Sequence, residues 1–465
     1  MQCVCLTLSL HRTSLAGLGL GSFAAGSTLM PTLQSLALAV YSLLTRLLQP
    51  ALRWKLRRRA RSEPAYAQHV AQRFGHYGAA GLQAGPVLWV HSVSLGETRA
   101  IGALLRLLRA QWPDMRLLLT HGTATGLEAG TDLLQAGDLQ VWQPWDTPAA
   151  TRRFVQHFKP RLGLLVDTEI WPNLVHACAQ ASVPLCLVNA RLSAHSLRRA
   201  QRLHWLSEPA YQSLAGVWPQ DEDQAMRFRT LGVKPHAPTG NIKFDMEPDL
   251  DLWSQGQAAR QAQLRPVLML AVSREGEEQM WLDAVRHARA SGMGWERVQW
   301  LIVPRHPQRF DAVAQLLQTA GLTVSRRSVD GSVFSQADVW LGDTLGEMSF
   351  YYGLSAVALL GGSFAPLGGQ NLIEAAACRC PVVMGPHTYN FAQAAQMAQE
   401  AGAALEQANM TDAMDCALAL AQDPAALERA SSAAWAFAQA HRGAVLRLSQ
   451  ALAQRVEAAQ RQTSA

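Results

Sequence analysis

Hydrophobic residues along the chain fall into short continuous runs, and longer segments with helical spacing separate these runs. Continuous apolar runs of this kind predict strands that are buried on both faces, as in parallel sheets. The first series comprises PVLWVHS, MRLLLTH, LGLLVDT, PLCLVNA and GVWP. The second series comprises PVLMLAVS, VQWLIVPR, ADVWLGD, AVALLGG and PVVMG. Strands that alternate with helices predict parallel βαβ units, so the two series predict an α/β protein with two Rossmann-like domains facing a cleft.

The positions of the two series divide the chain of 465 residues. We predict a first Rossmann-like domain over residues 63–245 and a second over residues 246–465, which includes the alanine-rich C-terminal helices. The polar segment 246–263, rich in Gln and Asp, is predicted to be the hinge between them. Residues 1–29 are predicted to be a disordered or wrongly started leader, because Met30 offers a second start.

Residues 30–62 predict a membrane anchor. The apolar helical run 33–48 is shorter than the roughly 20 residues that span a bilayer, and Arg46 interrupts it. One narrow polar stripe appears at helical spacing, formed by Ser35, Ser42 and Arg46 of this run and by the following Gln49. This pattern favours a helix that lies in the membrane interface. The alternative is a core helix followed by a solvated basic tail.

The net charge of +6 is concentrated in one place. Six basic residues fall within nine positions, namely Arg53, Lys55, Arg57, Arg58, Arg59 and Arg61. Since the rest of the chain is close to neutral, a diffuse nucleic-acid-binding surface is not expected. We expect instead that this cluster binds one local anionic surface of a partner. Anionic lipids of a cytoplasmic membrane face are the partner that this cluster favours.

The cysteines and histidines indicate no metal site. The seven cysteines contain no CxxC pair, and the fourteen histidines show no HExxH spacing. These patterns argue against a disulfide framework and against a structural zinc site, and they fit a reducing environment. We therefore predict no metal bound to the protein.

Polar clusters follow most of the predicted strands, at the edge where open parallel sheets hold their ligands. Glu97 ends HSVSLGE, Glu169 lies in DTEIWPN, and Lys243 lies in GNIKFD near the domain junction. This placement predicts an enzyme. Two interpretations of Glu97 remain, a catalytic base and an ordinary first-turn helix carboxylate. Glu169 has the similar alternative of capping the helix that follows it.

The second half contains a glycine-rich loop that enters an alanine-rich helix, GGSFAPLGGQNLIEAAA, at residues 361–377. Free backbone amides at such a helix start bind phosphate, although simple turn formation is the alternative. Glu374 is placed to accept hydrogen bonds from ribose hydroxyls, and Arg305 and His306 supply cations at a strand end. Together with the LGE loop at 345–347, these residues predict a nucleotide-binding second domain.

Ten motifs in this order resemble those of the 3-deoxy-D-manno-octulosonic acid (Kdo) transferases: HSVSLGE, THGTATG, DTEIWPN, NARLS, GNIKFD, GEE, VPRHP, GDTLGE, GGSF and GGQNLIE. The resemblance runs from about residue 30 to the C-terminal helices. It implies a GT-B glycosyltransferase that moves Kdo from CMP-Kdo to the lipid A precursor at the cytoplasmic face of the inner membrane. That reaction begins the lipopolysaccharide core.

The resemblance also implies roles for individual residues. Glu97 matches the general base, and Glu169 and Lys243 match positions assigned to transition-state stabilisation. The first domain would bind the acceptor and the second would bind the CMP-sugar. The positions that match the CMP site are Pro304, Arg305, Leu345, Gly346, Glu347, Asn371, Leu372, Ile373 and Glu374. The resemblance implies CMP-Kdo as the donor substrate, and it implies neither a cofactor nor a metal.

Several positions depart from the family pattern. Arg274 stands where a His usually precedes GEE, Gln370 and Leu372 replace the usual His and Pro around the asparagine, and Asp167 replaces a Glu. These departures concern donor contacts and leave the implied base in place. The alternatives are another GT-B nucleotide-sugar enzyme, such as a UDP-sugar transferase or epimerase, and a non-catalytic membrane-bound nucleotide-sugar sensor.

Overall fold

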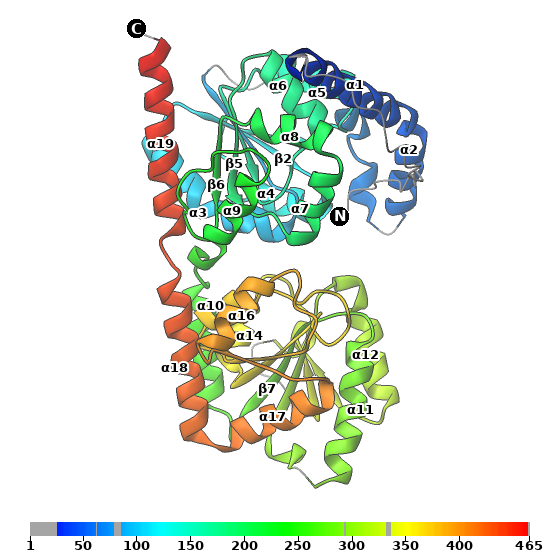
Figure 1. Cartoon of the computed structure of the whole chain (residues 1–465). Coiled ribbons are helices and arrows are strands. Elements are labelled where there is room, and N and C mark those ends of the chain that lie inside the picture. The colour runs from blue at the N-terminus through cyan, green and yellow to red at the C-terminus, as the bar shows by residue number, and fades with distance from the viewer. Residues whose placement is uncertain (1–25, 62, 79–84, 293, 332–335, 464–465) are drawn as a thin grey trace, which may run out of the picture.

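The computed structural model describes residues 26–61, 63–78, 85–292, 294–331 and 336–463. Most of the predicted leader, residues 1–25, lies outside the described residues. The described chain forms two α/β units, one containing each predicted strand series, and Figure 1 shows helices on both faces of the sheets. Every strand of both units pairs in parallel with its neighbours, as the apolar runs predict.

The first sheet has six strands in the order β3-β2-β1-β4-β5-β6. Its strands are β1 (Val87–His91), β2 (Arg116–His121), β3 (Leu139–Trp142), β4 (Leu162–Val166), β5 (Leu185–Ala190) and β6 (Gly216–Pro219). This is the strand order of the Rossmann fold, and the order reverses between β1 and β4. The loops after β1 and β4 therefore diverge to opposite faces of the sheet and leave room for a ligand between them.

The second sheet has seven strands in the order β13-β12-β11-β7-β8-β10-β9. Its strands are β7 (Val267–Ser273), β8 (Gln299–Pro304), β9 (Val324–Arg326), β10 (Val339–Leu341), β11 (Val357–Leu360), β12 (Val382–Met384) and β13 (Ala404–Glu406). Here the order reverses between β7 and β11. All ten predicted strands are confirmed, and the three that the sequence did not predict, β3, β9 and β13, lie at sheet edges.

The helices begin where side chains can satisfy their free amides. In the first unit they are α3 (Leu95–Gln111), α4 (Ala124–Thr131), α5 (Pro148–Phe158), α6 (Pro172–Gln180), α7 (Ala194–Arg202), α8 (His204–Gln212) and α9 (Glu222–Arg229). In the second unit they are α10 (Leu250–Gln261), α11 (Glu277–Ala290), α12 (Phe310–Thr319), α13 (Arg327–Asp330), α14 (Met348–Leu354), α15 (Leu372–Ala377), α16 (Ala392–Glu400), α17 (Met410–Gln422) and α18 (Pro424–Ala440). Ser94, Thr123 and Thr147 accept the first amides of α3, α4 and α5.

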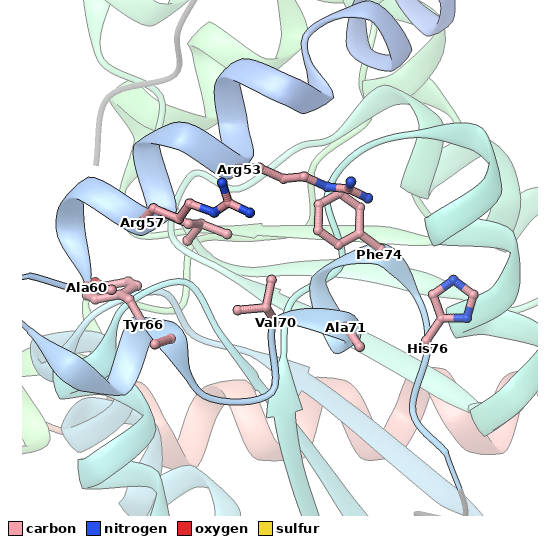
Figure 2. A pocket seen from close by; sticks show the side chains of 10 residues that line it. Arg53, Arg57, Ala60, Tyr66, Val70, Ala71, Phe74 and His76 are labelled. Carbon is pink, nitrogen blue, oxygen red and sulfur yellow. The ribbon is translucent and has the colours of Figure 1, made fainter.

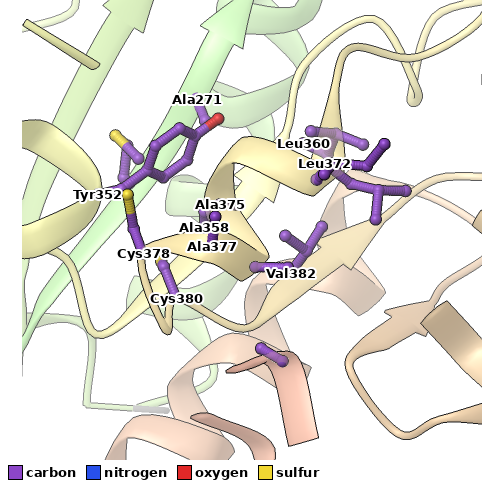
Figure 3. Close-up of a cluster of buried hydrophobic side chains, with 14 of the residues drawn as sticks. Ala271, Tyr352, Ala358, Leu360, Leu372, Ala375, Ala377, Cys378, Cys380 and Val382 are labelled. Carbon is purple, nitrogen blue, oxygen red and sulfur yellow. The ribbon is translucent and has the colours of Figure 1, made fainter. Parts of the chain in front are cut away.

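Small residues let the helices of the second unit pack closely on its sheet. Figure 3 shows Leu372 and Ala375 of α15 beside Leu360 and Ala358 of β11, all within one buried cluster. A Cβ atom on Gly256 of α10 would lie 2.2 Å from a backbone oxygen of α14, so these two helices also touch along their backbones. The polar segment 246–263, predicted as a hinge, is therefore mostly a helix packed on the second unit, and that prediction is wrong for α10.

The last helix, α19 (Ala444–Thr463), returns to the first unit (Figure 1). Val445, Leu448 and Leu452 join the core cluster formed by β1, β2 and α3. Asp245 of the short helix η3 (Ile242–Asp245) accepts hydrogen bonds from the amides of Gly443 and Val445, both at 2.5 Å. We assigned all C-terminal helices to the second domain. The structure shows instead that α19 covers the first domain, because its apolar face packs against apolar side chains of α3.

The N-terminal helices α1 (Gly26–Leu47) and α2 (Gln49–Arg59) lie along the first unit. One face of α1 is held by Tyr41, whose hydroxyl donates to Asp146 Oδ2 at 2.8 Å, and by Ser42, which donates to Asn173 Oδ1 at 2.7 Å. Another face carries an apolar stripe that is between 41% and 67% exposed: Leu33, Leu36, Val40, Leu43, Leu44 and Leu47. This exposed stripe contradicts the alternative of a core helix.

Within the described ranges, no single helix is long and apolar enough to span a membrane. The bent pair formed by residues 33–47 and α2, with 48° between its two parts, meets those criteria only when both parts are counted together.

Candidate active site

The predicted carboxylates gather at the point where the first sheet reverses its strand order. Glu97 follows β1, and Asp167 and Glu169 follow β4, the strand paired with β1. Asp167 adopts a left-handed backbone conformation with φ of 63°, and Asn189 at the end of β5 does so with φ of 51°. Left-handed conformations are uncommon outside glycine and concentrate at functional sites. These two strand ends are therefore candidates for a functional site.

Glu97 occupies the third position of α3 and closes its N-terminus. Its Oε2 accepts the amide of Val93 at 2.7 Å, and its Oε1 accepts the Ser94 hydroxyl at 3.0 Å. Ser94 Oγ in turn accepts the amide of Glu97. This reciprocal arrangement is a capping box in which the glutamate reaches one residue further back than usual. The helix-start interpretation of Glu97 therefore holds, and the same bonds fix the carboxylate in one orientation.

The charges around Glu97 make its proton affinity unusual. Burial raises the pKa of Glu97 to about 7, and the negative charge of Asp167 acts in the same direction, while Lys243 opposes it. A carboxylate with a pKa near neutrality is matched to accepting a proton from a hydroxyl at physiological pH. The two interpretations of Glu97 are thus compatible, because the cap holds a carboxylate whose surroundings suit a base.

Lys243 binds Asp167 rather than Glu97. Its Nζ lies 2.7 Å from Asp167 Oδ2, and Asn189 Nδ2 donates to Asp167 Oδ1 at 2.5 Å. Burial alone would raise the pKa of Asp167, but Lys243 and Arg191 hold it below its usual range. Asp167 therefore stays ionised and fixes the position of Lys243. From the sequence, we noted Asp167 only as a departure from the family pattern, and we did not single out Asn189.

Glu169 does not cap the helix that follows it. The first amides of α6, on Asn173 and Leu174, donate to Asp146, and the α6 N-terminus has no other side-chain cap among its described neighbours. Burial raises the pKa of Glu169 as well. The capping alternative for Glu169 is wrong, and the carboxylate is left beside Asp167 and Glu97.

Two buried histidines beneath the loop after β1 are structural. His91 Nδ1 lies 2.9 Å from Thr120 Oγ1, and His121 Nδ1 lies 3.1 Å from the Ser92 carbonyl oxygen. Burial lowers the pKa of His91 to about 3 and that of His121 to about 4. Both rings are neutral at physiological pH and support the loop that carries Glu97.

In the second unit, Glu277 fills the glycine-rich loop. Its carboxylate accepts the amides of Arg274, Gly362, Phe364 and Ala365 at 2.6 to 3.3 Å. The amides of Gly362 and Phe364 in the GGSF segment, and that of the following Ala365, are therefore occupied by a carboxylate of the protein. The pairing of β7 with β11 brings Glu277 to this part of the loop. The phosphate-binding amides that the sequence predicts lie further along, at the start of α15, where Asn371 accepts the amide of Ile373, and that site stays a prediction.

Arginines supply the positive charge instead. Burial lowers the pKa of Arg305 after β8, and the positive charges of Arg99 on α3 and Arg274 after β7 lower it further. Burial raises the pKa of Glu374, and the charges of Arg99 and Arg305 counteract it. Arg99, from the first unit, was not singled out from the sequence, although it follows Glu97 by two positions. Arg274 also forms an ion pair with Glu275 at 3.1 Å, so three arginines and two carboxylates leave a net positive charge for an anionic ligand.

The remaining predicted nucleotide-site residues have different surroundings. Glu347 is held by Arg327, which donates to both of its oxygens at 2.7 and 3.1 Å, so it serves as a structural anchor of its loop. Leu345 is 67% exposed beside Gly346, whose φ is 83°. Asn371 Oδ1 accepts the amide of Ile373 and caps α15. Pro304, Leu372 and Ile373 are buried.

Contacts between the two units occur at the same strand-end loops. Arg191 Nη1, after β5, donates to the carbonyl oxygen of Asn390 at 3.1 Å. Lys243 Nζ lies 5.9 Å from the ring centroid of Phe391. These contacts bring the carboxylate cluster of the first unit toward the arginines of the second. Among the described residues, no three His, Cys, Asp or Glu side chains gather closely enough to hold a metal ion.

Known proteins share this sequence and fold. The family model described as 3-deoxy-D-manno-octulosonic-acid transferase (kdotransferase) matches residues 68–246. The 3-deoxy-D-manno-octulosonic acid transferase of Bordetella pertussis is 45% identical over 426 residues, which cover 89% of this chain and 98% of the relative. The Haemophilus influenzae transferase of the same name is 32% identical over 390 residues, 83% of this chain and 91% of the relative.

A solved structure supports the same fold. The UDP-GlcNAc 2-epimerase from Neisseria meningitidis bound to UDP-GlcNAc covers 80% of this chain and 99% of its own, with a TM-score of 0.52 and 15% identity. That likeness concerns the fold alone, which is GT-B. The sequence relatives favour the transferase over the epimerase and sensor alternatives. The chain therefore belongs to the 3-deoxy-D-manno-octulosonic acid (Kdo) transferase family of glycosyltransferases.

Proposed function

We propose that this enzyme transfers Kdo from CMP-Kdo to a hydroxyl of the lipid A precursor, with Glu97 as the general base. The observation that carries the proposal is the position of Glu97, fixed by the α3 cap at the strand-order reversal with its pKa raised to about 7. A base in this range accepts a hydroxyl proton at neutral pH as the oxygen attacks.

The acceptor oxygen forms a bond to the anomeric carbon of Kdo and gives its proton to Glu97, while the bond from that carbon to the CMP phosphate breaks and CMP leaves with the electron pair. Lys243 is fixed by Asp167 at 2.7 Å and supplies positive charge beside the reacting groups. Glu169 in its ionised form favours a positive anomeric centre in the transition state, and burial, which raises its pKa, opposes that ionisation.

The arginines of the second domain suit a donor with two anionic groups. CMP-Kdo carries one negative charge on its phosphate and one on the sugar carboxylate. A Cβ atom on Gly362 would lie 3.1 Å from Gln370 Nε2 and 3.6 Å from Arg274 Cγ, so the two positions that depart from the family pattern face the same glycine. We infer that Arg274 and Gln370 together replace two histidines, and that Arg274 and Arg305 bind the anionic groups of the donor.

The N-terminal helices support action at the cytoplasmic face of the inner membrane. The exposed apolar stripe of α1 and the basic residues of α2 together suit an interface that is apolar within and anionic at its surface. An enzyme at such an interface can reach the headgroup of a lipid acceptor while the acceptor stays in the bilayer.

The test is mass spectrometry of the lipid after incubation of the enzyme with CMP-Kdo and tetraacylated lipid A precursor. We expect a mass gain of one or more Kdo units with the wild type and none with Glu97→Gln. Excess CMP should inhibit the reaction more strongly than UDP. Equal product from Glu97→Gln would refute the general base, and product from a UDP-sugar in place of CMP-Kdo would refute the donor.

A further inference from the structure

A pocket of about 640 Å³ lies beneath the basic helix α2. Its volume is in the range of ligand sites in proteins. Figure 2 shows Arg53 and Arg57 reaching over it from α2, with Tyr66, Val70 and Phe74 on its other side. The inner walls are therefore mostly apolar, with His76 as a further polar lining residue, and the rim carries two guanidinium groups.

The two rim arginines have no acidic partner. Among the residues that the structure describes, no carboxylate forms an ion pair with Arg53 or Arg57, and both side chains are exposed. Arg53 is positioned by Phe74, because its guanidinium carbon lies 4.5 Å from the centroid of that ring. An apolar cavity with unpaired cations at its opening suits a ligand that has an acyl chain and a phosphate.

A short series of contacts joins this pocket to Glu97. Tyr66, in its wall, accepts the amide of Ala124 at 3.2 Å through its hydroxyl oxygen. The adjacent Thr123 donates its hydroxyl to the carbonyl oxygen of Val93 at 2.7 Å, and the Val93 amide donates to Glu97 Oε2 at 2.7 Å. The pocket and the carboxylate therefore flank the same loop, which places a ligand's lipid part near the reacting hydroxyl.

We propose that the pocket beneath α2 holds one acyl chain of the phosphorylated lipid acceptor while Arg53 and Arg57 contact its phosphate. This proposal rests on the proposed function, because it assigns part of the acceptor to a place in the first domain. Bulk anionic phospholipid has the same chemistry, and the adjacency to the loop that carries Glu97 is what favours the acceptor. The exposed apolar stripe lies on α1, the helix before α2, so an acyl chain of the acceptor can pass along it from the bilayer to the pocket.

The first test fills the pocket. Ala71→Trp places an indole in the wall, and its effect is measured as the ratio of kcat/KM for the tetraacylated acceptor to kcat/KM for the same bisphosphorylated disaccharide without acyl chains, both in detergent. We expect the ratio to fall about tenfold, as when roughly two methylene groups lose their buried contact. The ratio does not depend on the fraction of variant that folds. An unchanged ratio would overturn the proposal.

The second test removes the rim charges. Arg53→Ala/Arg57→Ala should raise KM for both acceptors about tenfold, since both carry phosphates. The matched control is Arg58→Ala/Arg61→Ala. It also removes two positive charges from this segment, but neither residue lines the pocket. Equal effects of the two double variants would show a diffuse attraction and overturn the assignment.

Two binding measurements without donor separate the remaining outcomes. Equilibrium binding of the tetraacylated lipid in detergent should weaken about tenfold in Ala71→Trp. If instead Ala71→Trp binds that lipid normally but loses affinity for phosphatidylglycerol vesicles, the pocket belongs to bulk lipid and the proposal fails. If the wild type transfers no Kdo to either acceptor while Ala71→Trp still weakens lipid binding, the proposed function fails and the pocket assignment stands.

Discussion

Lys243 Nζ lies 2.7 Å from Asp167 Oδ2, and this ion pair joins the segment before the domain crossing to the end of β4. Both side chains are largely buried, at 17% and 6% exposed. The pair sits beside Glu97, so Lys243 lowers the pKa of Glu97 while Asp167 raises it. The proton affinity of the proposed base is therefore set by a neighbouring ion pair and by burial, without a direct bond from Lys243.

Lys243→Met should shift the pH dependence of activity. Without the lysine, the pKa of Glu97 rises, because an attractive charge is lost and Asp167 remains. The acid limb of the kcat/KM profile should therefore move to higher pH, and activity at pH 7 should fall by at least about tenfold. Lys234→Met, at an exposed position of the same domain, is the control and should leave the profile in place. An unmoved acid limb in Lys243→Met would argue against Glu97 as the titrating base.

Glu97→Gln should stabilise the protein at alkaline pH. The folded enzyme holds the Glu97 proton up to about pH 7, whereas the unfolded chain releases it near 4.5. Between these values the folded state binds more protons, so the free energy of unfolding falls as pH rises. At pH 8 the variant should be more stable by about 1–3 kcal/mol, and at pH 4 the difference should vanish.

Urea denaturation at both pH values measures this difference. Glu128→Gln on α4 serves as the control, since Glu128 is exposed. A gain in Glu97→Gln that is equal at pH 4 and pH 8 would mean that the raised pKa is not its source.

Arg274 and Gln370 should act together on the donor. Arg274→Ala should raise KM for CMP-Kdo about tenfold, because one charge-assisted contact is lost, while KM for the acceptor changes little. Since both side chains approach Gly362, the effects of Arg274→Ala and Gln370→Ala should not add in the double variant. Arg286→Ala on the exposed face of α11 is the control. Additive effects in the double-mutant cycle would separate the two positions.

Acidic substitutions on the α1 stripe should release the enzyme from membranes. Leu36→Glu/Leu43→Glu places two charges on a face that is 59% and 56% exposed, and it should lower partitioning onto phosphatidylglycerol vesicles at least about tenfold. Leu250→Glu/Leu264→Glu adds the same charge at exposed positions of the second domain and should leave partitioning nearly unchanged. Cosedimentation measures both. Equal losses would indicate net charge rather than the stripe.

The fold followed from the sequence wherever strands are central. Strands β3, β9 and β13 escaped prediction because they are only partly buried at their sheet edges, which removes the need for a continuous apolar run. The edge strand β6 was predicted, since all four of its residues are buried. Membership of α19 in the first domain was also missed, since an amphipathic helix does not record which sheet its apolar face covers.

The candidate site was predictable where it depends on strand ends alone. Glu97, Glu169 and Lys243 were found in this way. The occupation of the glycine-rich loop by Glu277 was not, because Glu277 and Gly362 are 85 positions apart and meet only after β7 and β11 pair. Likewise, the charge of Arg99 reaches the second domain only in the assembled molecule.

The return of α19 has a consequence for the independence of the two domains. The second domain is in effect an insertion, since the first one begins before β1 and is completed by a helix at the end of the chain. A fragment that stops at residue 245 would leave the apolar side of α3 open to water and should aggregate. A fragment of residues 250–440, by contrast, carries its own sheet and both of its core clusters except Phe244, and it should fold alone. Joining residues 26–245 to 443–463 through a short linker should restore a soluble first domain.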